Sequence, residues 1–452
     1  MRRSTILWLA RPASVPDRVR LGLVALSVAA AGALLIVAAQ IARLPAEQYV
    51  NGFVTDDGLA PYVAEPGLRP GSILATVLLC VPVLALAQQA LRVGSVARDR
   101  RLAALRLAGA TPRDVRAVAI VEAGGAAMAG GVLAGPGALL LWLLLGVLPP
   151  SGLRLVAAPD ALDLPVWLGV ILLAGLTGAV AGVAVQARVV TEPLGVRRRG
   201  RASGLGRRSL AALLFGLGLL LTGLFLLRDD DGDAAIFLAV MPGVLLSALA
   251  GGPRLVRACS TRLVRREGAR NLLAGRRLEA EPQGPGRVAG VLAICGIALG
   301  LDVGLIVEVS AEQDDLSFYL GGAGLAGAAI LVAAAVAVLT LLVGAADQLL
   351  DGRRPLAALA ALGTDEAELA RVLARQLSTA AVPAIALGVV VGGLGGGLLG
   401  FSAPITVATR LVLTLVTASL AAGAVWLVAR LVVRLLRRAL GTAIAPENLR
   451  VA

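Results

Sequence analysis

Long apolar runs recur along the whole chain and constrain its fold more than any other feature. Most of them reach the roughly 20 residues that an α-helix needs to cross about 30 Å of hydrocarbon. They predict an all-α polytopic membrane protein with ten transmembrane helices. The expected spans are Leu21–Ile41, Ser72–Leu91, Val118–Leu148, Pro165–Ala187, Leu210–Leu227, Ala234–Gly252, Val288–Val307, Tyr319–Ala346, Leu377–Leu399 and Leu411–Ala429.

The composition excludes several classes of chemistry. Of the 452 residues, 58% are hydrophobic and 16% are charged; none is histidine, and all 42 basic residues are arginine. Without histidine there is no Ser-His-Asp triad and no histidine metal site. Without lysine there is no Walker A loop and no Schiff base. We therefore expect no enzyme activity, cofactor or metal in this chain, and any ATP must be bound by another chain.

The net charge of +13 is distributed unevenly between alternate loops. Thirty-seven arginines lie in the two termini and in every second loop, whereas only Arg43, Arg69, Arg154, Arg228 and Arg410 lie on the other side. Cytoplasmic loops of membrane proteins carry such an excess. The bias predicts a multi-pass membrane protein with both termini in the cytoplasm. The charge then matches anionic membrane lipid, and no nucleic acid partner is expected.

Two loops on the opposite side carry clusters of acidic residues. Either a cation site or a plain solvated loop would fit this pattern. The residues concerned are Asp229, Asp230, Asp231, Asp233, Glu312, Asp314 and Asp315.

Two cytoplasmic loops repeat one another at a constant offset of 254 residues. The letters LAAL stand at 102–105 and again at 356–359, and Gly109 aligns with Gly363. In the first copy, apolar residues at helical spacing predict a short amphipathic helix. Gly109 is expected to end that helix, because glycine readily adopts the left-handed backbone of a helix C-terminus.

The next span is expected to begin directly after each corner. In the first copy Thr111 is a good N-cap, Pro112 suits the first helical position, and Asp114 completes a turn like a capping box. In the second copy Thr364 is the expected cap, and the acidic residues after it complement the helix dipole.

These segments resemble parts of FtsX-like ABC transporter permeases. The pattern RRLAALRLAGATP at 100–112, followed by a Gly-rich span with Glu122 near its start, is similar to the cytoplasmic loop of that family. Segments 188–197 and 269–277 resemble its closing segment and the basic helix that precedes a module. The resemblance implies two four-helix modules, residues 1–208 and 254–452, around a central helix pair at 209–253. The order is similar to ten-span permeases for antimicrobial peptides, without their large extracytoplasmic domain.

The resemblance also implies a location, the bacterial plasma membrane, and a function. The chain would be the permease subunit of an ABC transporter. Its partner would be a cytoplasmic ABC ATPase, present in two copies, that binds ATP and Mg. The permease would couple ATP hydrolysis in this partner to export, or outer-leaflet extraction, of an amphipathic antibiotic, peptide or lipid. A mechanotransmission regulator of an extracellular partner and a secondary transporter are the alternatives. Two coupling helices, Arg100–Ala108 and Arg354–Leu362, would contact the ATPase. The residues expected to take part are Arg100, Arg101, Leu102, Leu105, Arg106, Gly109, Thr111, Arg354, Leu356, Leu359, Gly363 and Thr364.

Three polar residues of the spans are candidates for transmission or for the substrate pathway. Glu122 and its counterpart Gln376 would link loop movement to the span, or would lie at the interface near Arg116 and Arg375. Asp302 is the only carboxylate well inside a span, where such groups tend to face a cavity or a partner. It would serve the substrate pathway, form a structural ion pair, or lie near the outer interface.

Two further patterns concern packing. Glycines 388, 392, 396 and 400 predict close helix contacts on the ninth span. Residues 254–277 interleave arginine with leucine and valine, which predicts a basic amphipathic helix among the inner headgroups.

Overall fold

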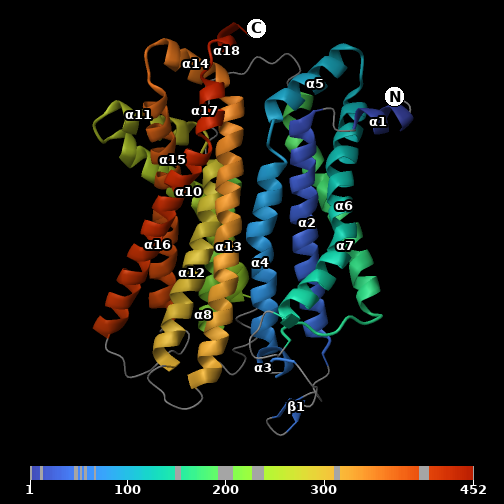
Figure 1. The fold of residues 1–452 in the computed structure, drawn as a ribbon, viewed down its shortest axis with the longest axis vertical. Coiled ribbons are helices and arrows are strands. Elements are labelled where there is room, and N and C mark those ends of the chain that lie inside the picture. The colour runs from blue at the N-terminus through green and yellow to red at the C-terminus, as the bar shows by residue number, and fades with distance from the viewer. Residues whose placement is uncertain are drawn as a thin grey trace. The chain divides into compact units, whose positions relative to one another are not determined.

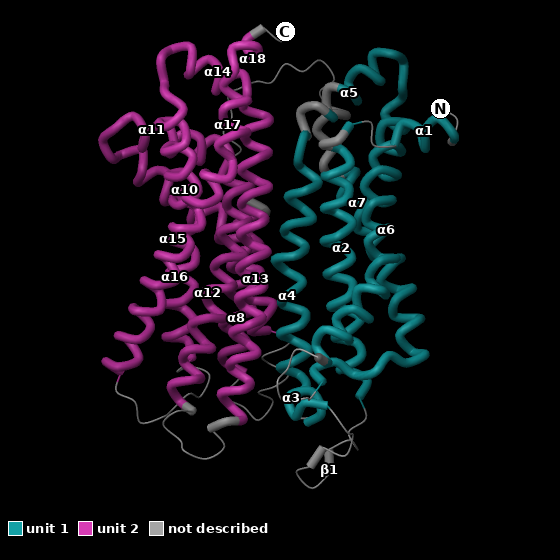
Figure 2. Tube along the Cα trace, in the orientation of Figure 1, with its two compact units in different colours: residues 1–197 teal, residues 198–452 magenta. Residues whose placement is uncertain are grey.

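The computed structural model describes residues 3–10, 14–44, 49–50, 53–54, 59–65, 68–147, 154–191, 207–226, 239–309, 316–396 and 407–450. The chain forms two compact units, which comprise Met1–Arg197 and Arg198–Ala452 (Figures 1 and 2). In both units long helices dominate.

Within the described residues, nine helices are long and apolar enough to cross a membrane. Each corresponds to one of the expected spans, so the chain is a multi-pass helical membrane protein. The nine stretches are Asp17–Ala42, Arg69–Ala90, Pro112–Gly146, Asp163–Val183, Ser209–Leu226, Gln283–Glu308, Phe318–Asp351, Glu366–Gly395 and Val407–Leu435.

The first unit is a four-helix bundle with short elements at its two ends. Helix α2 packs on α4 and α6, and α6 packs on α7. Alanines and branched residues fill the α2–α6–α7 contact, among them Ile36, Ala134 and Val170. The elements are α1 (Arg3–Leu9), α2 (Val15–Ala42), β1 (Tyr49–Val50), β2 (Phe53–Val54), α3 (Pro61–Ala64), α4 (Arg69–Ala90), α5 (Ser95–Leu107), α6 (Pro112–Val147) and α7 (Asp163–Thr191), with β1 and β2 antiparallel.

The second unit repeats this arrangement and adds a helix pair. Helix α12 packs on α13 and α15, α15 packs on α16, and the added helices α8 and α10 pack on each other and, through α10, on α12. The central pair therefore belongs to the second compact unit. The elements are α8 (Arg207–Leu226), α10 (Met241–Val264), α11 (Ala269–Ala280), α12 (Gln283–Val309), α13 (Leu316–Asp351), α14 (Arg353–Ala361), α15 (Glu366–Gly395), α16 (Val407–Leu435), α17 (Arg437–Ala443) and α18 (Glu447–Arg450).

Small residues allow the central helices of each unit to approach closely. A Cβ atom at Gly388 or Gly392 would overlap a carbonyl oxygen of α12, which confirms the packing role expected for these two glycines. Gly130 of α6 meets the Ala25 carbonyl of α2 in the same way. Gly400 lies outside the described residues.

The stretch around the expected sixth span differs from the prediction. Part of Ala234–Gly252 lies outside the described residues, and α10 does not stop at Gly252 but continues to Val264. The basic stretch 254–277 is accordingly two helices and not one. They are separated by a turn in which Gly268 adopts a φ of +110°, a value that glycine tolerates without steric strain.

Candidate functional site

The helix α5 ends in a tight corner that the sequence predicted. Gly109 has a φ of +95°, and its N–H donates to the Arg106 carbonyl at 3.0 Å. The next N–H, that of Ala110, donates to the Leu105 carbonyl at 3.0 Å. These two bonds define a Schellman motif, which satisfies carbonyl groups that a helix C-terminus would otherwise leave without donors.

The helix α14 ends in the same corner. Gly363 has a φ of +90°, and its N–H donates to the Ala360 carbonyl at 2.9 Å. The N–H of Thr364 donates to the Leu359 carbonyl at 3.1 Å. Every position of this corner lies 254 residues after its counterpart in the first unit. The repeat inferred from the sequence is therefore also a repeat of backbone structure.

The helices that follow start at equivalent positions but are capped differently. In the first unit Thr111 and Asp114 form the expected capping box: the Thr111 N–H donates to the Asp114 carboxylate at 2.9 Å, and the Asp114 N–H donates to the Thr111 hydroxyl at 3.3 Å. In the second unit the N-cap is Asp365, without a side-chain capping bond. The expectation that Thr364 caps α15 was wrong, because Thr364 completes the corner of the preceding helix.

The repeated leucines of α5 and α14 face inward. Leu102 and Leu356 are each only 2% exposed. Leu102 packs against Val115 and Val118 of α6, and Leu105 lies half-buried at the edge of the same cluster. Leu359 is also half-buried. The apolar stripe therefore holds each short helix to its own unit.

Other leucines point away from the units at the same corners. Leu107, the last residue of α5, is 80% exposed, and Leu362, directly after α14, is 83% exposed. Both lie within the predicted coupling helices, but the sequence analysis did not single them out, because it placed the contact surface in the apolar stripe. A leucine one or two residues before a predicted helix-ending glycine was the available signal: Leu107 lies two residues before Gly109, and Leu362 lies directly before Gly363.

The arginines of the two corners are placed unequally. Arg354 is exposed, and Arg106 is half-buried. Arg101 donates from Nη2 to the Leu9 carbonyl of α1 at 2.5 Å, so it ties α5 to the N-terminal helix. The side chain of Arg100 lies outside what the structure describes.

Glu122 forms an ion pair with a residue that the sequence analysis did not connect to it. Its carboxylate contacts the guanidinium of Arg20 on α2, which is only 2% exposed, and Asp17 lies 3.9 Å from the same guanidinium. Arg98 of α5 lines the same small cavity, which has a volume of about 10 Å³. The cluster therefore joins α2, α5 and α6 through charged groups. The ion-pair partner of Glu122 is therefore Arg20, whereas the sequence analysis named Arg116 as a neighbour.

Gln376 makes a neutral contact at the equivalent position. Its side-chain amide donates to the Gln348 side-chain oxygen of α13 at 3.0 Å. The backbone carbonyl of Gln348 also accepts a hydrogen bond from the N–H of Gly352, at the corner between α13 and α14. In the second unit a pair of amides therefore links α15 to α13 at the position where an ion pair links α6 to α2 in the first unit.

In each unit a further short helix packs on the start of the span that follows the corner, α6 or α15. In the first unit Ile6 and Leu9 of α1 join the cluster of Val115 and Val118. In the second unit Leu263 of α10 and Ala274 of α11 pack against Val372, which aligns with Val118. Sequence analysis predicted the basic helix of the second unit but missed α1, which has only seven residues.

An ion pair adds to this contact in the second unit. Arg270 of α11 makes two hydrogen bonds of 2.5 Å to the Glu368 carboxylate of α15, and these raise the pKa of the Arg270 guanidinium. The pair is largely exposed, so its contribution to stability is small.

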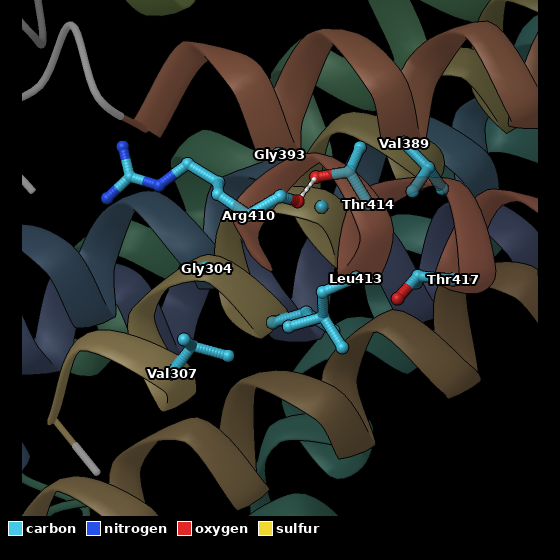
Figure 3. Close-up of a pocket in the computed structure, with 10 residues that line it drawn as sticks. Gly304, Val307, Val389, Gly393, Arg410, Leu413, Thr414 and Thr417 are labelled. Carbon is cyan, nitrogen blue, oxygen red and sulfur yellow. Dashed lines mark hydrogen bonds between the residues drawn. The ribbon is translucent and has the colours of Figure 1, made fainter. Parts of the chain in front are cut away.

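A small cavity lies near the ends of the second unit's helices that are opposite the α14 corner. It has a volume of about 20 Å³, room for a single water, and lies among α12, α15 and α16. Figure 3 shows the Thr414 hydroxyl donating to the Arg410 carbonyl, while the Arg410 side chain extends away from the cavity. The Arg410 guanidinium lies 3.6 Å from the Glu308 carboxylate. A cavity of this size holds no substrate.

Asp302 lies on α12, seven residues before its end, and faces α13. Of the three candidates, Glu122 belongs to unit 1, and Gln376 and Asp302 lie near opposite ends of the helices of unit 2.

No family model, no curated protein and no solved structure matches this chain.

Proposed function

We propose that this chain is the permease subunit of an ABC transporter of the bacterial plasma membrane. It exports an amphipathic substrate or extracts it from the outer leaflet, using ATP that a separate cytoplasmic ATPase binds with Mg and hydrolyses. Helices α5 and α14 are the coupling helices, and each seats in a groove of one ATPase subunit. The arginine-rich loops, including both corners, face the cytoplasm.

The observation that carries this proposal is the repeated corner with an exposed leucine. Leu107 and Leu362 stand at the tips of two equivalent loops, at neighbouring and not identical positions of the repeat, and are more than three-quarters exposed. Fully burying one leucine side chain stabilises a structure or complex by about 1.5–3 kcal/mol. An exposed leucine does not gain this free energy until a partner covers it. A repeated apolar tip on a short helix fits a partner that offers two equivalent grooves, as a dimeric ATPase does.

Each corner connects its short helix directly to a long span, so movement of the short helix would move the span. Each short helix is held on one side by its buried leucine and on the other by a glycine corner that leads directly into a long span. The span α6 has 36 residues and is therefore about 54 Å long. Closure of the ATPase pair would move α5 and α14 as rigid elements, and α6 and α15 would carry that motion across the membrane.

The test is complex formation between the full-length chain and each ABC ATPase of its source organism, co-expressed one at a time. The double variant Leu107→Asp and Leu362→Asp is expected to lose co-purification and substrate-stimulated ATP turnover. The reason is that a buried, unpaired carboxylate cannot occupy an apolar groove. Membrane insertion and thermal stability are expected to stay unchanged, because both leucines are exposed.

The matched control replaces the same two residues by methionine, which keeps the apolar surface and preserves binding. Wild-type binding by the double aspartate variant would contradict the coupling assignment. ATPase-dependent control of an extracytoplasmic enzyme, without movement of any small molecule, would instead favour the mechanotransmission regulator.

A further inference from the structure

A single carboxylate lies deep within a span of the second unit. Asp302 is seven residues before the end of α12, which places it about 10 Å inside that end of the helix. Under the orientation proposed above, this depth corresponds to the outer leaflet. A charged side chain at such a depth is expensive, so it requires a partner, a proton or a ligand.

The structure supplies no partner for this carboxylate among the residues it describes. The Asp302 Oδ1 atom is out of contact with solvent and makes no hydrogen bond there. No described arginine lies within ion-pair distance of the Asp302 carboxylate. Arg410, which lies at the same end of the second unit's helices, pairs with Glu308. Burying an unpaired carboxylate without hydrogen bonds costs far more than burying a paired one.

The surroundings leave space beside the carboxylate. A Cβ atom built on Gly327 of α13 would lie 3.5 Å from Asp302 Oδ2 and within 4 Å of no other atom of a neighbouring side chain or helix, so the glycine leaves a gap in front of this oxygen. Gly324 lies one turn closer to the same end, is exposed, and would have no atom within 4 Å of a Cβ. Asp302 itself is half-buried. The carboxylate is therefore reachable from the surrounding bilayer along the face of α13 that carries the two glycines.

We propose that Asp302 binds the cationic group of an amphipathic substrate, held between α12 and α13 at the level of the outer leaflet. This rests on the proposed function and names the chemistry of its substrate. A lipophilic ammonium or phosphonium provides the missing positive charge, and its apolar part stays in the hydrocarbon. Neutral and anionic amphiphiles lack the charge that Asp302 requires.

Binding of radiolabelled tetraphenylphosphonium to the full-length chain in nanodiscs tests this site without any ATPase. Asp302→Asn is expected to weaken that binding at least tenfold, because the amide keeps the size of the side chain and removes its charge. Glu308→Gln, which removes a carboxylate from the same helix, is expected to leave the affinity unchanged. Equal affinity in the wild type and in Asp302→Asn would overturn the proposal.

Two variants of Gly327 test the geometry. Gly327→Ala adds a methyl group at ordinary contact distance and is expected to bind tetraphenylphosphonium almost as well as the wild type. Gly327→Leu fills the gap and is expected to weaken binding about as much as Asp302→Asn does. Full binding by Gly327→Leu would place the cation elsewhere and overturn the proposal.

A second measurement needs no variant. A hydrophobic carbodiimide is expected to label Asp302 of the wild-type chain, as read by mass spectrometry, and tetraphenylphosphonium is expected to reduce that label. A neutral amphiphile of similar size is the control and should not protect. Labelling of Asp302 that the cation leaves undiminished would overturn the site. Cation binding that never stimulates any ATPase would keep the site and contradict the proposed transporter instead.

Discussion

Gly109 and Gly363 end two different helices with almost the same backbone angle, φ of +95° and +90°, at positions 254 residues apart. Around both glycines the two hydrogen bonds of the corner join equivalent atoms. The spans that follow the corners, α6 and α15, also start at equivalent residues, Pro112 and Glu366. The two corners are therefore structurally equivalent.

Replacing either glycine by alanine is expected to strain the corner. A left-handed conformation costs a residue with a Cβ about 1–2 kcal/mol, and no atom lies near enough to clash. We expect Gly109→Ala and Gly363→Ala to lower the thermal denaturation midpoint in detergent. The control is Gly125→Ala within α6, where the space is also open but the backbone is helical; it should be neutral or stabilising. Equal effects at positions 109 and 125 would contradict the corner geometry.

The buried ion pair of the first unit is expected to be sensitive to loss of one partner. Glu122→Gln leaves the buried Arg20 guanidinium with only the more distant Asp17, at 3.9 Å, as a counter-charge, and loss of a close partner of a buried ion pair costs up to about 3–5 kcal/mol. The double variant Arg20→Gln and Glu122→Gln imitates the amide pair of the second unit and should recover much of that loss. Thermal denaturation of the three proteins measures the coupling between the two residues. Additive losses would mean that the two side chains do not interact.

The contact between α12 and α15 is expected to tolerate no side chain at Gly392. Gly392→Ala would overlap the Ile297 carbonyl and force the helices apart, at a cost of about 1–3 kcal/mol or more. Gly395 lies on the same helix with no atom within 4 Å of a Cβ, so Gly395→Ala is the matched control. A wild-type denaturation midpoint in Gly392→Ala would contradict this helix contact.

The orientation of the chain can be tested at described, exposed positions. A cysteine at Ala161, in the loop before α7, should react with a membrane-impermeant maleimide in intact cells. Cysteines at Leu107 and Leu362 should react only after permeabilisation, in a background with Cys259→Ala, because the other two cysteines are buried. Labelling of position 107 or 362 in intact cells would reverse the proposed topology.

The sequence predicted the spans and the corners because their signals are local. Runs of apolar residues identified nine helices that the structure describes, and Gly109 with Thr111 and Asp114 predicted a helix end and a helix start correctly. Thr364 misled the prediction because a threonine suits both the end of a corner and an N-cap.

The remaining features depend on which residues meet in space. Glu122 lies 102 positions from Arg20, so Arg116 was the nearer choice along the chain. The apolar stripe of α5 looked like a contact surface, yet such a stripe normally packs on its own core, as Leu102 does. The orphaned oxygen of Asp302 and the gap at Gly327 exist only in three dimensions.

Site-specific crosslinking tests the central claim most directly. A photoreactive amino acid at position 107, and in a second protein at position 362, is expected to crosslink to the same ABC ATPase in membranes. The same amino acid at exposed Leu272 of α11 should not. Crosslinks to the ATPase from both corners would support two equivalent coupling helices, whereas crosslinks from neither corner, or from position 272 alone, would contradict the account.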